Sequence, residues 1–85
     1  MVSPIRLQGV GMRNAIPAKE LQVNDEILYN HGYMATITKI SNPNIKGTIF
    51  YTVKSKDNGE LFDCRTTASR LFAVTRVNPV PYTED

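Results

Sequence analysis

"TIFYTVKSKDNGELFDCRTT", residues 48–67, is the stretch that indicates the fold most clearly. Apolar and polar residues alternate along it, and Asn58-Gly59 interrupts the alternation. Asn-Gly is typical of a two-residue β-hairpin turn, because both residues tolerate a positive φ. Counting outward from such a turn gives the expected facing pairs: Ser55–Phe62, Val53–Cys64 and Tyr51–Thr66 on one face, and Lys54–Asp63 and Thr52–Arg65 on the other. The stretch therefore predicts a hairpin with one apolar face and one charged face.

The preceding stretch, residues 26–41, predicts a second hairpin. Its polar segment Asn30-His31-Gly32 contains a His-Gly pair at the position where a hairpin needs residues that accept a positive φ. The expected strands are Glu26–Tyr29 and Tyr33–Ser41. The register stays open, because a two-residue loop places Tyr29 opposite Met34, whereas a bulged three-residue loop places Leu28 there.

Turns are expected on both sides of the two hairpins. Pro17 suits the first position of a helical turn, which residues 18–21 complete with Leu21 pointing inward. Asn24-Asp25 predicts a tight turn, since asparagine tolerates a positive φ. After the second hairpin, we expect a short turn at Thr67–Arg70 and a last strand at Leu71–Arg76.

The two ends of the chain show weaker patterns. Residues 1–15 have no hydrophobic period, and we expect a flexible N-terminal arm there. Met12 follows Gln-Gly-Val-Gly, and Gln-Gly-Val can be encoded by a purine-rich string typical of a bacterial ribosome-binding site. This suggests the hypothesis that translation starts at Met12. Prolines 79 and 81 lack backbone donors, so residues 77–85 are expected to form an extended tail after a domain spanning residues 16–76.

Five short strands with one helical turn predict an all-β fold. A sheet this small exposes its edges unless it curls and closes, so we expect a small, partly open barrel. Residues 20–40, "ELQVNDEILYNHGYMATITKI", resemble the opening of SH3-like barrels. KOW-type members of that class and Hint-like domains often carry a Leu-x-Val-Gly-Asp-x-Val phrase before a hairpin. The matching residues here are Leu21, Val23, Asp25 and Ile27, with Asn24 in place of the glycine.

The late segment "TTASRLFAV" is similar to the 3₁₀ turn and closing strand of the same fold. The resemblance implies an SH3-like, partly open barrel of about five antiparallel strands, with a 3₁₀ turn before the last strand. It implies no function, because the phrase encodes a turn geometry and because one fold hosts many functions.

Composition limits the class of protein. Eighty-five residues suit one small domain, and 41% hydrophobic and 21% charged residues are ordinary for a soluble globular chain. The net charge of +2 is smaller than dedicated duplex binders usually carry. The single Cys64 cannot form a disulfide within the chain, and no signal peptide or bilayer-spanning apolar stretch is visible, so we expect a cytoplasmic location.

The residue inventory argues against catalysis. The chain has one histidine and one cysteine, and we expect His31 at a hairpin tip and Cys64 facing the core, too far apart to act as base and nucleophile. No Cys/His pair has metal-ligand spacing, and the Hint catalytic residues cannot be placed. We therefore expect no enzyme activity, no metal and no cofactor.

Binding is the remaining kind of function. The aromatic side chains around the 30–32 tip could stack on nucleobases, although a purely structural hairpin is the alternative. From Cys64 to Val80 the chain has three arginines and no acid, and these arginines either contact phosphates or lie across acidic neighbours such as Asp63. The candidate binding residues are Tyr29, His31, Tyr33, Lys54, Arg65 and Arg70.

Two functions follow from these candidates. The first is a non-catalytic module that binds nucleic acid through the aromatic tip and the C-terminal arginines. The second is a protein-binding adaptor or inhibitor, of phage or mobile-element origin, acting on a bacterial protein machine. A steep fall of affinity with salt would indicate phosphate contacts and so favour the first function.

Overall fold

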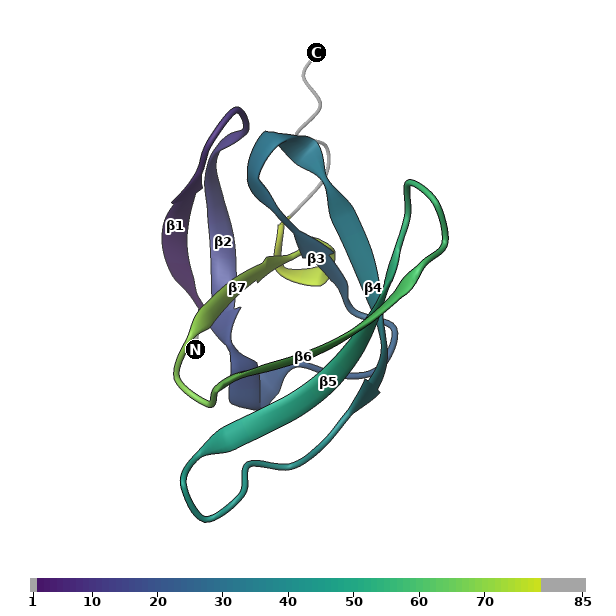
Figure 1. Ribbon diagram of the computed structural model, residues 1–85. Helices are drawn as coiled ribbons and strands as arrows, with labels where there is room; N and C mark the ends of the chain where they lie inside the picture. Colours follow the sequence, from purple (N-terminus) through teal and green to yellow (C-terminus); the bar gives the residue numbers. More distant parts are fainter. Residues whose placement is uncertain (1, 79–85) are drawn as a thin grey trace.

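The computed structural model describes residues 2–78 and shows an all-β domain (Figure 1). Seven antiparallel strands form one open sheet in the spatial order β1-β2-β7-β3-β4-β5-β6. The strands are β1 (Ser3–Leu7), β2 (Gly11–Pro17), β3 (Glu26–Leu28), β4 (Met34–Ile40), β5 (Thr48–Ser55), β6 (Leu61–Thr67) and β7 (Leu71–Val74). The helical segments among residues 2–78 are three short 3₁₀ turns: η1 (Ala18–Glu20), η2 (Asn30–Gly32) and η3 (Thr75–Val77).

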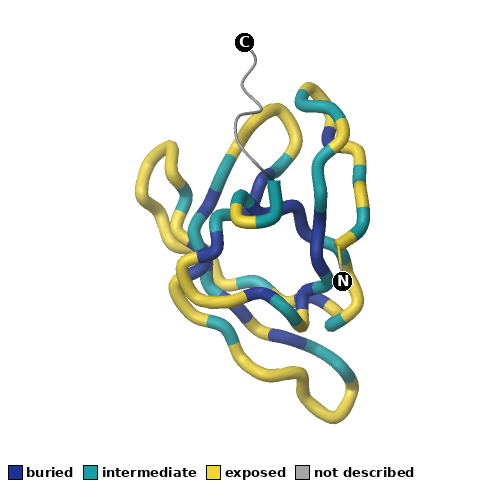
Figure 2. The backbone as a smooth tube through the Cα atoms, turned by 180° about the vertical axis from the view of Figure 1, so that it is seen from behind, coloured by how far each residue is buried: buried dark blue, intermediate teal, exposed yellow. Residues whose placement is uncertain are grey.

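The sheet coils around a core to which five strands each contribute one almost fully buried side chain. These side chains are Ile16 of β2, Ile27 of β3, Ile37 of β4, Ile49 of β5 and Val74 of β7. The rings of Tyr51 and Phe72 meet edge to face in the same core, with 5.9 Å between their centroids. Figure 2 shows the buried residues along the inner parts of the chain and the exposed residues mainly in the connecting loops. The all-β class and the open, bent sheet are thus confirmed.

The N-terminal segment is a correction. We expected a flexible arm at residues 1–15, but β1 and β2 form a hairpin there, and β2 also pairs with β7. Leu7 is buried in a second, smaller core, whose members are Leu7, Ala15, Leu28 and Ala73. The proline at position 4 does not prevent pairing, because β1 is an edge strand, where a missing donor is tolerated. The sheet therefore has seven strands and not five.

Several local predictions are confirmed. The expected helical turn is η1, and Leu21 after it is buried. Asn24 has a φ of 79°, as a tight turn before β3 requires, and His31 has a φ of 63°. Leu28 faces Met34, so of the two registers left open the three-residue loop is the one that forms.

The register of the β5–β6 hairpin differs from the prediction by two residues. Tyr51 faces Cys64 and Val53 faces Phe62, because the loop contains four residues, 56–59, and Ser55 pairs with Glu60. In that loop Gly59 takes the positive φ, at 74°. A two-residue shift leaves every side chain on its expected face, so hydrophobic alternation cannot distinguish the two registers.

The end of the domain also differs from the prediction. The segment between β6 and β7 is a turn, and the 3₁₀ turn η3 follows the last strand where we expected one before it. Strand β7 is shorter than predicted, since it ends at Val74. The predicted extended tail at 77–85 lies outside the described residues, except for residues 77 and 78.

Candidate functional site: the outer face of strands β4, β5 and β6

The tip at residues 30–32 is tied to the N-terminal hairpin. The backbone N–H of His31 donates to the carbonyl of Gln8 at 2.6 Å, and the side-chain oxygen of Asn30 accepts from the Gln8 N–H at 2.9 Å. A Cβ atom added at Gly9 would come within 2.9 Å of Nδ1 of His31, so the imidazole lies against that turn. The two turns lie beside each other in Figure 1. The histidine thus helps to hold two hairpins together.

The two tyrosines on either side of the tip have different surroundings. Tyr29 is partly buried and packs against the main core, and burial raises the pKa of its phenol. Tyr33 is 58% exposed. They form no clamp around the tip, because one faces the interior and the other faces solvent.

The three arginines of the C-terminal run are separated. Arg76 donates from Nε to Asp25 at 2.7 Å, and this ion pair holds η3 against the turn before β3. The guanidinium of Arg70 lies 5.6 Å from the centroid of Phe72, a cation–π distance. Arg65 is exposed on β6 and makes no ion pair with another described residue.

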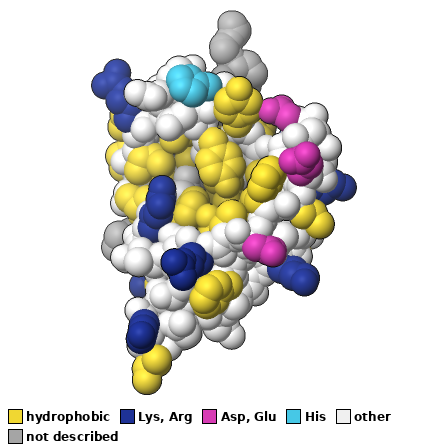
Figure 3. All heavy atoms as spheres, in the orientation of Figure 1, with side chains coloured by type: hydrophobic (Ala, Val, Ile, Leu, Met, Phe, Trp, Pro, Cys, Tyr) yellow, Lys and Arg dark blue, Asp and Glu magenta, His cyan; other side chains and the backbone are white. Residues whose placement is uncertain are grey.

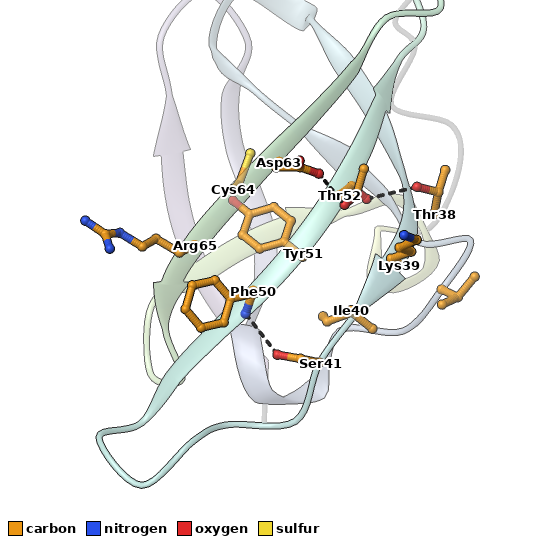
Figure 4. Close-up of a pocket in the computed structure, with 11 residues that line it drawn as sticks. Thr38, Lys39, Ile40, Ser41, Phe50, Tyr51, Thr52, Asp63, Cys64 and Arg65 are labelled. Carbon is orange, nitrogen blue, oxygen red and sulfur yellow. Dashed lines mark hydrogen bonds between the residues drawn. The ribbon is translucent and has the colours of Figure 1, made fainter.

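Arg65 projects onto the outer face of β4, β5 and β6, which is the best-formed candidate site. Its cross-strand partner is Phe50, whose side chain is 52% exposed. Figure 4 shows both side chains extending from adjacent strands. They line an open groove of about 860 Å³, whose other lining residues are Val23, Thr38, Lys39, Ile40, Ser41, Tyr51, Thr52, Asp63 and Cys64. Of the six candidates proposed from the sequence, Arg65 alone lines this groove.

A β-bulge in β4 directs Lys39 into the same groove. Ile37 faces Val53 on the inner side, and the pairing then jumps to Lys39 opposite Thr52, with Thr38 as the extra residue. Without the bulge, Lys39 would share the inner face with Ile37, because alternate strand residues point to the same side. The hydroxyl of Thr38 donates to the carbonyl of Thr52 at 3.3 Å. The bulge therefore places an exposed cation on the outer face.

The groove has a basic excess. Lys39 and Arg65 are its cations, and Asp63 is its acid. The carboxylate of Asp63 accepts a hydrogen bond from the hydroxyl of Thr52 at 2.8 Å. Lys54 is exposed on the same face of β5, one step further toward the loop and opposite Leu61.

Sequence reasoning missed Phe50 and Lys39. Phe50 was visible as an aromatic residue in phase with the polar Thr52 and Lys54, which is the signal that could have identified it. Lys39 gave no such signal, since its orientation depends on a bulge that the alternation does not reveal. The groove joins an exposed ring to two cations, and such a surface can bind a flat aromatic group that carries negative charge.

No group of His, Cys, Asp and Glu side chains in the described part of the chain could hold a metal ion. Within residues 2–78, no helix is long and apolar enough to cross a membrane. Comparison with protein-family models, with curated proteins and with solved structures found no match.

Proposed function

We propose that this protein is a non-catalytic binding module that binds single-stranded nucleic acid on the outer face of β4, β5 and β6. The observation that supports this most strongly is the exposed ring of Phe50, which has Arg65 opposite it across the hairpin and Lys39 in the same groove. Nucleobases stack on exposed aromatic rings regardless of sequence, at roughly 1–3 kcal/mol per base. Lys39 on β4 and Arg65 on β6 come from the two strands that pair with β5, which supports phosphate contacts beside a stacked base.

Single strands fit this surface better than a duplex does. The bases of a duplex are stacked on one another and cannot cover a ring on a sheet face, whereas those of a single strand can. A net charge of +2 and two cations in the groove support few phosphate contacts, so we expect modest affinity that falls with salt.

Fluorescence anisotropy with a labelled single-stranded oligonucleotide tests the proposal. Phe50→Leu keeps an apolar side chain but removes the ring, and we expect it to weaken binding about tenfold. Lys39→Gln and Arg65→Gln should each reduce the slope of log K against log salt by about one. Arg6→Gln on β1, at the opposite edge of the sheet, is the matched control and should leave the slope unchanged.

Absence of binding at low salt would contradict the proposal. A protein partner on the same face would then be the better interpretation, since Phe50 and Leu61 expose apolar area there, 52% and 64% respectively. A mainly apolar contact of that kind would respond to Phe50→Leu and hardly at all to salt.

A further inference from the structure

The free edge of the sheet at β6 has unpaired backbone groups, and the proposed function does not involve them. β6 ends the strand order, so one side of its backbone has no neighbouring strand among residues 2–78. Leu61 and Phe62 at its start are 64% and 47% exposed. It spans seven residues, from Leu61 to Thr67, without a proline. An exposed edge strand of this length, with apolar side chains at its start, is a template for pairing with another chain.

The backbone groups that face this edge follow from the pairing with β5. Ser55 donates to Glu60, and at the other end of the hairpin Ala68 donates to Gly47. Hydrogen-bonded pairs alternate with non-hydrogen-bonded pairs in an antiparallel ladder, so even-numbered residues of β6 bond to β5. The residues whose N–H and C=O groups point to the free edge are therefore Leu61, Asp63, Arg65 and Thr67.

We infer that β6 pairs antiparallel with β6 of a second copy of the chain, about a two-fold axis at Cys64. In this register Asp63 faces the partner's Arg65, and Arg65 faces the partner's Asp63. Both residues present free backbone groups to the edge, so the pairs that match in charge are also the pairs that can exchange backbone hydrogen bonds. Leu61 and Thr67 pair in the same way at the two ends.

Neighbouring registers are less favourable for a reason visible in the sequence Asp63-Cys64-Arg65. The backbone also permits a two-fold axis at Asp63 or at Arg65, but each choice places two like charges directly opposite one another, which is destabilising. The axis at Cys64 alone pairs both charges with their opposites. This self-complementarity identifies a second copy of the chain as the occupant of the edge.

The pairing would cover apolar surface and extend the outer face. Phe62, which is 47% exposed, would lie opposite the partner's Thr66. Figure 3 shows that hydrophobic side chains gather on one face of the molecule. Strands β4, β5 and β6 of the two copies would form one continuous outer face with both Phe50 rings on it. The pairing does not depend on the proposed ligand, although Arg65 belongs to both surfaces.

Charge exchange tests the pairing in the full-length chain by sedimentation equilibrium. We expect the wild type to approach twice its chain mass of 9.5 kDa as its concentration rises. Asp63→Arg alone and Arg65→Asp alone should each weaken the dimer at least tenfold, because each places like charges opposite one another. The double variant D63R/R65D should restore it. Lys54→Asp, an equal charge change on β5, is the control and should leave the dimer intact.

Cross-linking tests the position of the axis without relying on those variants. The two Cys64 residues would form a non-hydrogen-bonded pair with Cα atoms about 4.5 Å apart, within the range that a disulfide spans. Diamide, which takes up the two electrons and two protons that the thiols lose, should convert the wild type into a covalent dimer that dithiothreitol reverses. A wild type that is monomeric at all concentrations, or a dimer that the charge exchange does not restore and diamide does not link, would overturn the inference.

Discussion

The two edge hairpins of the sheet are built alike and used differently. At one edge, β1 is short, contains a proline and buries Leu7, and its turn is bonded to the tip at residues 30–32. At the other edge, β6 is longer and exposed over most of its length, and the loop before it is exposed, although Lys56 in that loop bonds to Met34 of β4 and pairs with Glu26. The N-terminal hairpin packs into the second core, and the β5–β6 hairpin presents a surface. The side chains on the outer face of β4, β5 and β6 contribute little to stability, so they can be selected for binding.

Removal of β1 is the most severe test of the claim that the N-terminal hairpin stabilises the fold. A chain beginning at Met12 loses the burial of Leu7, exposes Ala15, Leu28 and Ala73, and loses the bonds between Gln8 and the 30–32 tip. We expect the free energy of unfolding, measured in urea, to fall by at least about 3 kcal/mol, a large part of the stability of a domain of this size.

The same experiment bears on the hypothesis that translation starts at Met12, which stays a prediction. A natural product that begins there must fold without β1. If the shortened chain has the urea midpoint of the full chain, the N-terminal hairpin is dispensable and the comparison fails.

Two leucines on the two edge strands provide a matched pair. Leu7 on β1 is 8% exposed and Leu61 on β6 is 64% exposed. Leu7→Ala should cost about 2–4 kcal/mol, because it opens a cavity in the second core. At concentrations at which the chain is monomeric, Leu61→Ala should cost less than about 0.5 kcal/mol, as surface substitutions usually do. Equal shifts in chemical denaturation would show that the β6 side chain is covered in solution.

Two glycines at the hairpin turns provide a second pair. Gly9 and Gly59 both have a φ of 74°, so Gly→Ala at either position should cost about 1 kcal/mol in backbone strain. At Gly9 the new Cβ also meets His31, at 2.9 Å from Nδ1 and 3.3 Å from Cα, whereas at Gly59 the nearest atom is Cε of Lys54 at 3.7 Å. We therefore expect the melting temperature to fall further for Gly9→Ala. The reverse order would mean that the two turns do not touch.

The inner face of β5 makes a prediction about pH. Burial, together with the neighbouring Cys64 and Tyr29, raises the pKa of Tyr51 from an ordinary value of 10.0 to about 12. Between these values the unfolded chain loses a proton that the folded chain keeps, so this contribution to stability is complete below pH 10 and falls as the pH rises toward 12. Thermal melts across that range should show the decline, and Tyr51→Phe should reduce it. If stability falls equally with pH in the Tyr51→Phe variant, Tyr51 is not the cause of the decline.

Sequence patterns predicted the turns and the faces of this protein better than its register and edges. Asn24, His31 and Gly59 take positive φ where local chemistry indicates a turn. The predicted β5–β6 register was wrong by two residues, because a shift by an even number of residues leaves the alternation of apolar and polar faces unchanged. The N-terminal hairpin was missed, although Ile5 and Leu7 alternate with polar or exposed neighbours, because the run is short and is followed by two glycines.

The candidate site was only partly predictable for a related reason. Arg65 was expected on a charged face and lies there. Phe50 and Lys39 belong to the site because of two features that the alternation does not encode. The observed register puts Phe50 opposite Arg65. The bulge at Thr38 turns Lys39 outward. The 30–32 tip is exposed as expected, but its neighbour Gln8 comes from a hairpin that the pattern did not reveal.

Titration of the ¹⁵N-labelled protein with a single-stranded oligonucleotide, followed by amide chemical shifts, tests the central claim most directly. The claim is that the β5–β6 hairpin and β4 present the binding surface, while the N-terminal hairpin only supports the fold. The account predicts saturable shifts at Lys39, Phe50 and Arg65 that diminish with salt, and unchanged amides along β1 and β2. Shifts concentrated at Gln8, His31 and Tyr33, with β5 and β6 unchanged, would contradict it.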